Sequence, residues 1–155
     1  QLMAENGAEN WSIAKLATLS NAMRRWFKQK AYDDATIEQA AARVHELLAT
    51  TLASEQGKWV LQNRVSATSE LAIAFHSDQT TAKKIIDRTF IEDGTRWIID
   101  YKSVTLAKDS SEASLQAIAA QYQTQLDDYA SLFESEGLPI QKAIFFVSIG
   151  RLLLL

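Results

Sequence analysis

The sequence predicts a mixed α/β fold in which helices flank a central mixed sheet. Apolar residues recur at helical spacing over residues 36–53 and again over residues 112–136. Between these segments lie strand-like stretches around Asp93–Gly94, and an apolar run follows at residues 140–150. The predicted order is therefore helix, three strands, long helix and strand (α-β-β-β-α-β).

The first predicted helix covers residues 36–53. Thr36 or Asp34 is a suitable N-cap, and Gly57 follows the end of the apolar pattern. His45 lies beside Val44, at the border of the apolar stripe. Residues 11–30, which precede this helix, carry no pattern that determines their structure.

Strand composition is found in residues 58–65 (KWVLQNRV) and residues 70–77 (ELAIAFHS), with Asp78 and Gln79 as a break. Two more strands flank the EDGT segment at residues 92–95. The long helix over residues 112–136 is expected to stop at Gly137 and Pro139, which do not continue a helix.

The bulk composition limits the function classes. A chain of 155 residues that is 47% hydrophobic and 23% charged has the composition of a globular domain. The sequence has no cysteine, which excludes disulfides and thiolate metal sites and is compatible with a reducing cytosol. No apolar run reaches the roughly 18 residues of a membrane helix. The net charge of −3 argues against nucleic-acid binding by bulk electrostatics alone.

We divide the chain into a leading segment, residues 1–30, and a single domain, residues 31–155. Residues 20–23 (SNAM) read like an expression-tag remnant before an initiator methionine, so the leading segment is expected to be partly tag or non-contiguous. The apolar ending RLLLL is expected of a piece excised from a longer protein.

The hairpin around Asp93–Gly94 places charged residues in otherwise apolar strands. A type I′ turn at these two residues sets Glu92 opposite Thr95 and therefore Asp87 opposite Asp100. Because side chains alternate along a strand, Asp87, Asp100 and Lys102 should project to one side. The other side should carry a core surface made of Ile86, Phe90, Trp97, Ile99 and Tyr101.

Two directly opposed aspartates repel each other by roughly 3 kcal/mol at an effective dielectric constant near 20. A divalent cation offsets this repulsion, because carboxylate oxygens and water are the ligands that Mg²⁺ prefers. Two alternatives remain open: Lys102 pairs with an aspartate on a solvated face, or a three-residue loop shifts the register by one. Isoleucines at positions 85, 91 and 98 favour a partly covered face.

These residues also resemble a known family. Residues 85–103 (IIDRTFIEDGTRWIIDYKS) and residues 125–129 (QLDDY) resemble the nuclease domain of RecB-like and AddA-like helicase–nucleases, within the PD-(D/E)XK superfamily. The resemblance covers about residues 41–150. It implies a restriction-endonuclease-like core in the order helix, three strands, helix and strand.

The resemblance also implies roles for single residues. Asp87, Asp100 and Lys102 would be catalytic, the last two within the DYK signature. Mg²⁺ or Mn²⁺ would be held by His45, the two aspartates and the Tyr101 carbonyl. Ala41 and Lys84 stand where relatives have glycine, so the fit of the first helix departs from the family pattern.

Further residues are candidates for substrate binding or for support of the site: Gln125, Tyr129, Arg88 and Glu70. Gln125 and Tyr129 match the family's QLxxY motif and, four residues apart, share one helix face. Each candidate also has a structural reading. His45 can be a helix-edge histidine, Glu70 a solvated glutamate and Arg88 a solvated residue at a strand start, and the QLxxY pair can belong to a core helix.

The function implied is a Mg²⁺- or Mn²⁺-dependent DNA exonuclease domain of a UvrD-type helicase–nuclease, acting in double-strand-break repair and recombination. The sequence lacks a GxxxxGK[ST] segment, so the ATP-driven motor would lie elsewhere in the polypeptide, with a second helicase–nuclease subunit as partner. The expected location is the bacterial cytoplasm, at the nucleoid, without membrane contact. The alternatives are a non-catalytic module that binds DNA or docks a subunit, and another PD-(D/E)XK endonuclease.

Overall fold

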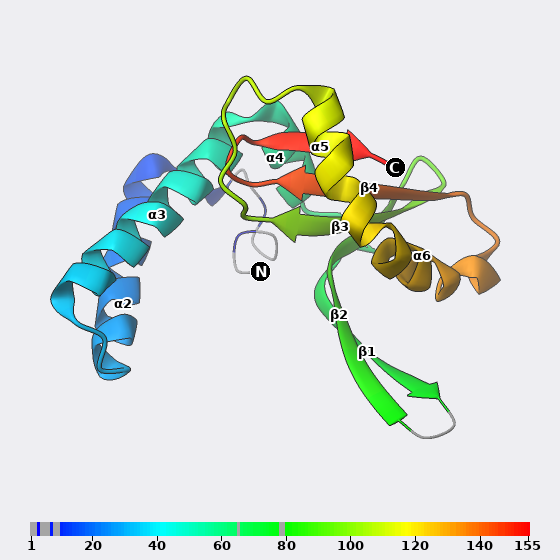
Figure 1. The fold of residues 1–155 in the computed structure, drawn as a ribbon, viewed down its shortest axis with the longest axis horizontal. Coiled ribbons are helices and arrows are strands. Elements are labelled where there is room, and N and C mark those ends of the chain that lie inside the picture. The colour runs from blue at the N-terminus through cyan, green and yellow to red at the C-terminus, as the bar shows by residue number, and fades with distance from the viewer. Residues whose placement is uncertain (1–2, 4–6, 8–9, 65, 78–79) are drawn as a thin grey trace.

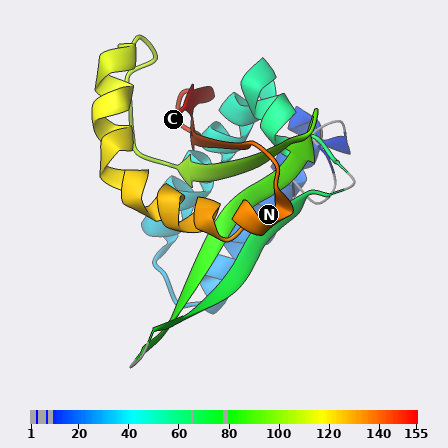
Figure 2. The ribbon, with the colours of Figure 1, turned by 90° about the vertical axis from the view of Figure 1, so that its right-hand side faces the viewer.

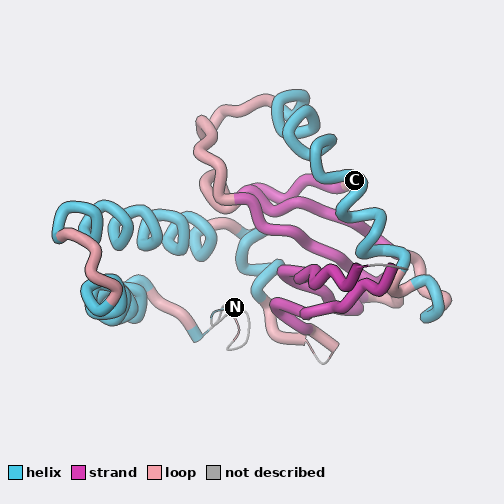
Figure 3. The backbone as a smooth tube through the Cα atoms, turned by 60° about the horizontal axis from the view of Figure 1, so that its bottom comes forward, coloured by secondary structure: helices cyan, strands magenta, loops and turns pink. Residues whose placement is uncertain are grey.

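A computed structural model describes residues 3, 7, 10–64, 66–77 and 80–155, and it has a mixed α/β fold. The five strands form one sheet in the order β1-β2-β3-β4-β5 (Figures 1 and 3). The strands are β1 (Thr68–Ser77), β2 (Thr80–Glu92), β3 (Thr95–Lys102), β4 (Ile140–Phe146) and β5 (Arg151–Leu154). The helices are α2 (Ile13–Gln29), α3 (Asp34–Ala53), α4 (Glu55–Leu61), α5 (Glu112–Ala119) and α6 (Gln123–Ser131), with the short 3₁₀ helices η2 (Ala120–Tyr122) and η3 (Glu134–Glu136).

The sheet is mixed because one of its connections is a helical crossover. Strands β1, β2 and β3 pair antiparallel in chain order. The α5–α6 segment then carries the chain to β4, which pairs parallel to β3, and β5 returns antiparallel to β4. A parallel neighbour requires such a crossover, since a tight hairpin reverses the chain direction.

Helices cover both faces of the sheet (Figure 2). On one face, α5 and α6 contribute Leu115 and Leu126 to a cluster with Ile98 and Ile144. On the other face, α4 contributes Val60 to a cluster of strand residues, which are Phe90, Ile99, Ala143 and Phe145. The central strand β3 is therefore buried from both sides, as its apolar residues require.

Helices α2 and α3 form a hairpin that extends away from the sheet (Figure 1). Asp33 is the N-cap of α3, where its side chain accepts a hydrogen bond from the Thr36 amide; the prediction of Thr36 or Asp34 as N-cap was wrong by one to three residues. The SNAM residues 20–23 lie within α2, in the leading segment whose structure was left open. Of the described helices, none has the combination of length and apolarity needed to span a bilayer.

Three predicted elements need correction. Residues 58–65 do not start as a strand, because Ser54 caps α4 by accepting a hydrogen bond from the Gly57 amide and the helix continues to Leu61. The predicted helix over residues 112–136 is divided at η2 and ends in η3. The final leucines form β5, a strand that was not predicted. The predicted break at Asp78 and Gln79 falls outside the described residues.

The predicted hairpin is confirmed. Asp93 and Gly94 have φ angles of 49° and 72°, as a type I′ turn requires. Glu92 pairs with Thr95, Phe90 with Trp97 and Arg88 with Ile99. The alternative three-residue loop is thereby excluded. Ile98 is fully buried, which confirms that this face is partly covered, although Ile85 is 45% exposed.

Candidate functional site

Strands β2 and β3 separate at Asp87. The paired register ends at Arg88 and Ile99, one step before Asp87 and Asp100. The Tyr101 amide donates a 2.7 Å hydrogen bond to Asp87 Oδ2, so a carboxylate replaces the backbone carbonyl that a continued ladder would supply. Ile86 consequently packs with Ile98 in the α5–α6 cluster; its predicted place beside Phe90 and Tyr101 was wrong.

Asp100 is the most buried acidic residue of the site, with only 5% of the residue exposed. Its Oδ2 forms an ion pair with the Lys102 ammonium at 2.7 Å. Among the described residues, no donor makes a hydrogen bond of ordinary geometry to this oxygen. The same ammonium lies 3.6 Å from the centre of the Tyr122 ring. Lys102 is thus held between the Asp100 carboxylate and an aromatic face, so the alternative in which Lys102 pairs with an aspartate is observed, but on a buried face and not a solvated one.

Helix α6 adds the QLxxY residues to this carboxylate. Gln125 Nε2 lies 3.2 Å from Asp100 Oδ1 and 2.9 Å from the Tyr129 hydroxyl. The Tyr129 hydroxyl donates to the Ile85 carbonyl at 2.9 Å. Because residues four apart share one face of a helix, both side chains reach the point where β2 leaves β3. We refer to Asp87, Asp100, Lys102, Gln125 and Tyr129 as the carboxylate cluster.

Burial is the main cause of the pKa shifts within the cluster. Burial raises the pKa of Asp87 above its usual range, the charge of Asp100 raises this pKa further, and the Tyr101 amide and Lys102 oppose the shift. Burial also raises the pKa of the Tyr129 hydroxyl, which the hydrogen bond from Gln125 partly offsets. Most of the shift in the pKa of Asp87 thus comes from lost solvation, and the Asp100 carboxylate adds to it although the Lys102 ammonium lies nearby.

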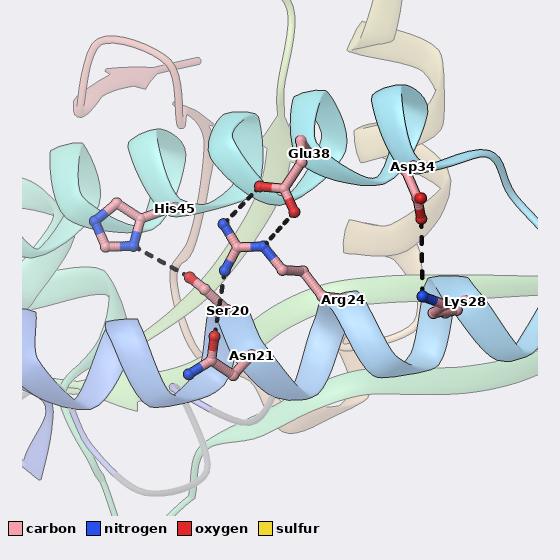
Figure 4. Close-up of polar contacts among 7 residues, drawn as sticks. All are labelled: Ser20, Asn21, Arg24, Lys28, Asp34, Glu38 and His45. Carbon is pink, nitrogen blue, oxygen red and sulfur yellow. Dashed lines mark hydrogen bonds and ion pairs between the residues drawn. The ribbon is translucent and has the colours of Figure 1, made fainter.

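His45 does not join the carboxylate cluster. Its Nδ1 lies 3.3 Å from Ser20 Oγ, so the ring faces α2 within the helical hairpin (Figure 4). Among the described residues, no group of three His, Cys, Asp or Glu side chains converges on a common metal position. The structure thus brings two of the three predicted side-chain ligands to one region and leaves the histidine elsewhere.

Among the described residues, neither the Arg88 nor the Glu70 side chain forms a hydrogen bond with a member of the carboxylate cluster. Arg88 is buried, donates to Ser69 Oγ at 2.9 Å and to the Gln62 carbonyl at 2.8 Å, and contributes to packing beneath β1. Glu70 is exposed and has a φ of 53°, which is uncommon within a strand. It occupies the register position opposite Asp87, between the pairs Ser69–Arg88 and Leu71–Ile86.

Two neighbours of the cluster were not predicted in their present roles. Tyr122 packs against the α5–α6 core cluster, and its ring also covers the Lys102 ammonium. Lys84 forms an ion pair with Asp128, on the same helix as Gln125 and Tyr129. Both contacts join residues far apart in sequence, so they depend on how the α5–α6 segment docks on the sheet, and no local pattern indicates them.

The residues present fit a divalent metal ion in part. Two carboxylates of adjacent strands are a donor set that Mg²⁺ or Mn²⁺ accepts when water completes the shell, but the Asp100 carboxylate is already paired with the Lys102 ammonium. A comparison of the chain with models of protein families gave no match, and a comparison with curated proteins gave none.

Proposed function

We propose that this chain is a metal-dependent nuclease domain that hydrolyses DNA phosphodiester bonds, with a restriction-endonuclease-like core. The observation that carries the proposal is the carboxylate cluster itself: Asp87 and Asp100 lie where two strands separate, and Lys102 lies beside them. The resemblance of the hairpin and the QLDDY segment to RecB-like and AddA-like nucleases supports the same assignment.

In this proposal Asp87, Asp100 and the Tyr101 carbonyl would hold Mg²⁺ or Mn²⁺. When bound, the ion would neutralise charge that builds up on the scissile phosphate. Lys102 orients and polarises the attacking water from its position next to Asp100. The Gln125 side-chain amide orients the Asp100 carboxylate by donating a hydrogen bond to it. The Tyr129 hydroxyl orients Gln125 by accepting a hydrogen bond from the same amide.

The test is cleavage of linear DNA with Mn²⁺ or Mg²⁺ and with EDTA. Asp100→Ala and Lys102→Ala should each lower the metal-dependent rate by at least about 100-fold, because each removes a group that acts on the transition state. Lys108→Ala, which removes an exposed charge outside the cluster, is the matched control. Full activity in both cluster variants would refute the proposal.

A second candidate, a non-catalytic DNA-binding or docking module, is favoured by one observation. His45 is bonded to Ser20 and does not complete a three-ligand metal site. Titration calorimetry separates the two candidates. A nuclease should bind Mn²⁺ with a heat that is lost in Asp87→Ala, whereas a docking module should give no such heat.

The wider context follows from the same resemblance. As a domain of a UvrD-type helicase–nuclease acting in double-strand-break repair, the chain would receive its DNA from a motor domain and a partner subunit, in the bacterial cytoplasm. We expect the isolated chain to degrade DNA weakly and without response to ATP. Strong processive digestion by the isolated chain would contradict this dependence.

A further inference from the structure

The tip of the α2–α3 hairpin combines exposed aromatic rings with exposed cationic side chains. Helix α2 carries four cationic and no acidic residues, although the chain has a net charge of −3. We define the hairpin tip as Arg25, Trp26, Lys28, Lys30 and Tyr32. The tip lies at the end of the hairpin that is remote from the sheet (Figure 1).

The charges of the tip are largely available to a partner. The neighbouring Arg24, which is not part of the tip, is not available to a partner. Its guanidinium donates to both Glu38 carboxylate oxygens, at 2.8 and 2.9 Å, and links α2 to α3 (Figure 4). Within the described part of the chain, neither Arg25 nor Lys30 has a carboxylate partner. Lys28 lies 3.9 Å from Asp34, and both side chains are highly exposed, so this pair is weak.

The aromatic rings of the tip present open faces. Trp26 and Tyr32 are 53% and 51% exposed. Both pack edge-on against Phe27, with interplanar angles of 73° and 84°, so neither ring is stacked on it. The Lys30 ammonium lies 5.8 Å from the centre of the Trp26 ring. Two half-exposed rings next to exposed cations match the requirements of unpaired nucleotides, whose bases stack and whose phosphates carry charge.

We propose that the hairpin tip binds single-stranded nucleic acid, with Trp26 and Tyr32 stacking on bases and Arg25, Lys28 and Lys30 contacting phosphates. An anionic membrane is the weaker match, because the tip exposes rings but no aliphatic side chains, and Asp33 and Asp34 lie beside it. The inference extends the proposed function by a second contact for the same class of substrate. It does not require hydrolysis.

The test is the binding of fluorescein-labelled oligo(dT) of about 20 nucleotides to the full chain in EDTA, measured by fluorescence anisotropy over a series of salt concentrations. Trp26→Ala should weaken binding about 5- to 100-fold, and Trp26→Phe should restore most of the affinity, since a phenyl ring still stacks. Arg25→Gln with Lys30→Gln should lower the slope of log K against log salt by about 1.4.

The control is Lys58→Gln with Lys108→Gln, which removes two exposed charges elsewhere and should leave the slope nearly unchanged. Equal losses in control and tip variants, or unchanged affinity in the tip variants, would overturn the proposal. So would tip-dependent binding to phosphatidylserine vesicles without tip-dependent binding to oligo(dT). If the tip variants bind oligo(dT) like the parent while the parent chain still cleaves DNA in a metal-dependent way, the tip proposal fails and the proposed nuclease does not.

Discussion

At the scale of single residues, the cluster holds a charge that is unfavourable for folding. Asp87 accepts a hydrogen bond from Tyr101, but burial and the nearby Asp100 raise its pKa. A carboxyl group whose folded-state pKa is raised binds more protons when folded. Stability therefore falls as the pH rises from the ordinary value of 3.8 through the raised folded-state pKa.

Asp87→Asn should consequently stabilise the chain at pH 7, by on the order of 1 kcal/mol, because the amide oxygen can still accept the Tyr101 hydrogen bond while the charge is removed. Urea unfolding at pH 7 and at pH 3 measures the effect, which should vanish at pH 3 where the parent carboxyl is protonated. Asp109→Asn, on an exposed loop, is the matched control. A variant less stable than the parent at pH 7 contradicts this account of Asp87.

At the scale of elements, local chemistry explains the hairpin better than it explains the helices. Asp93–Gly94 fixes the β2–β3 register because both residues adopt positive φ, which few other pairs tolerate. Residues 58–61 have strand composition but are helical, since the Ser54 cap and the close packing of Gly57 on α3 decide their conformation. Tertiary contacts commonly override such weak propensities.

Two glycine substitutions separate these effects. A Cβ at Gly57 would lie 2.1 Å from the Thr51 carbonyl oxygen, so Gly57→Ala should cost more than about 3 kcal/mol of stability. A Cβ at Gly94 meets nothing within 4 Å, and Gly94→Ala should cost only about 1 kcal/mol through its φ of +72°. Chemical denaturation of both variants provides the measurement, and equal losses would disprove the close approach at Gly57.

At the scale of the whole molecule, the α5–α6 crossover assembles the cluster. It brings Gln125 to Asp100 and Tyr122 to Lys102 from positions at least 20 residues away in the sequence. The α2–α3 hairpin carries His45 to a different place, beside Ser20. The metal-binding capacity of the chain should therefore depend on the sheet carboxylates and not on this histidine.

Thermal unfolding with Mn²⁺ tests whether metal binding depends on the sheet carboxylates and not on His45. A concentration about 100 times the dissociation constant should add about 2.7 kcal/mol of stability to the parent chain, which corresponds to a rise of several degrees in Tm. His45→Ala should keep this rise, whereas Asp100→Asn should lose it, with EDTA as the reference for each. Loss of the rise in His45→Ala would mean that the helical hairpin moves toward the sheet on metal binding.

The hairpin turn, its register and hence the positions of Asp87 and Asp100 on neighbouring strands can be predicted from local sequence. They depend on backbone preferences of two adjacent residues and on the two-residue period of a strand. The separation of the strands at Asp87, the contribution of Gln125 and Tyr129 from α6 and the contact of His45 with Ser20 cannot be predicted in this way. Those outcomes depend on the packing of helices against the sheet, which joins residues too distant in sequence for any local pattern to specify.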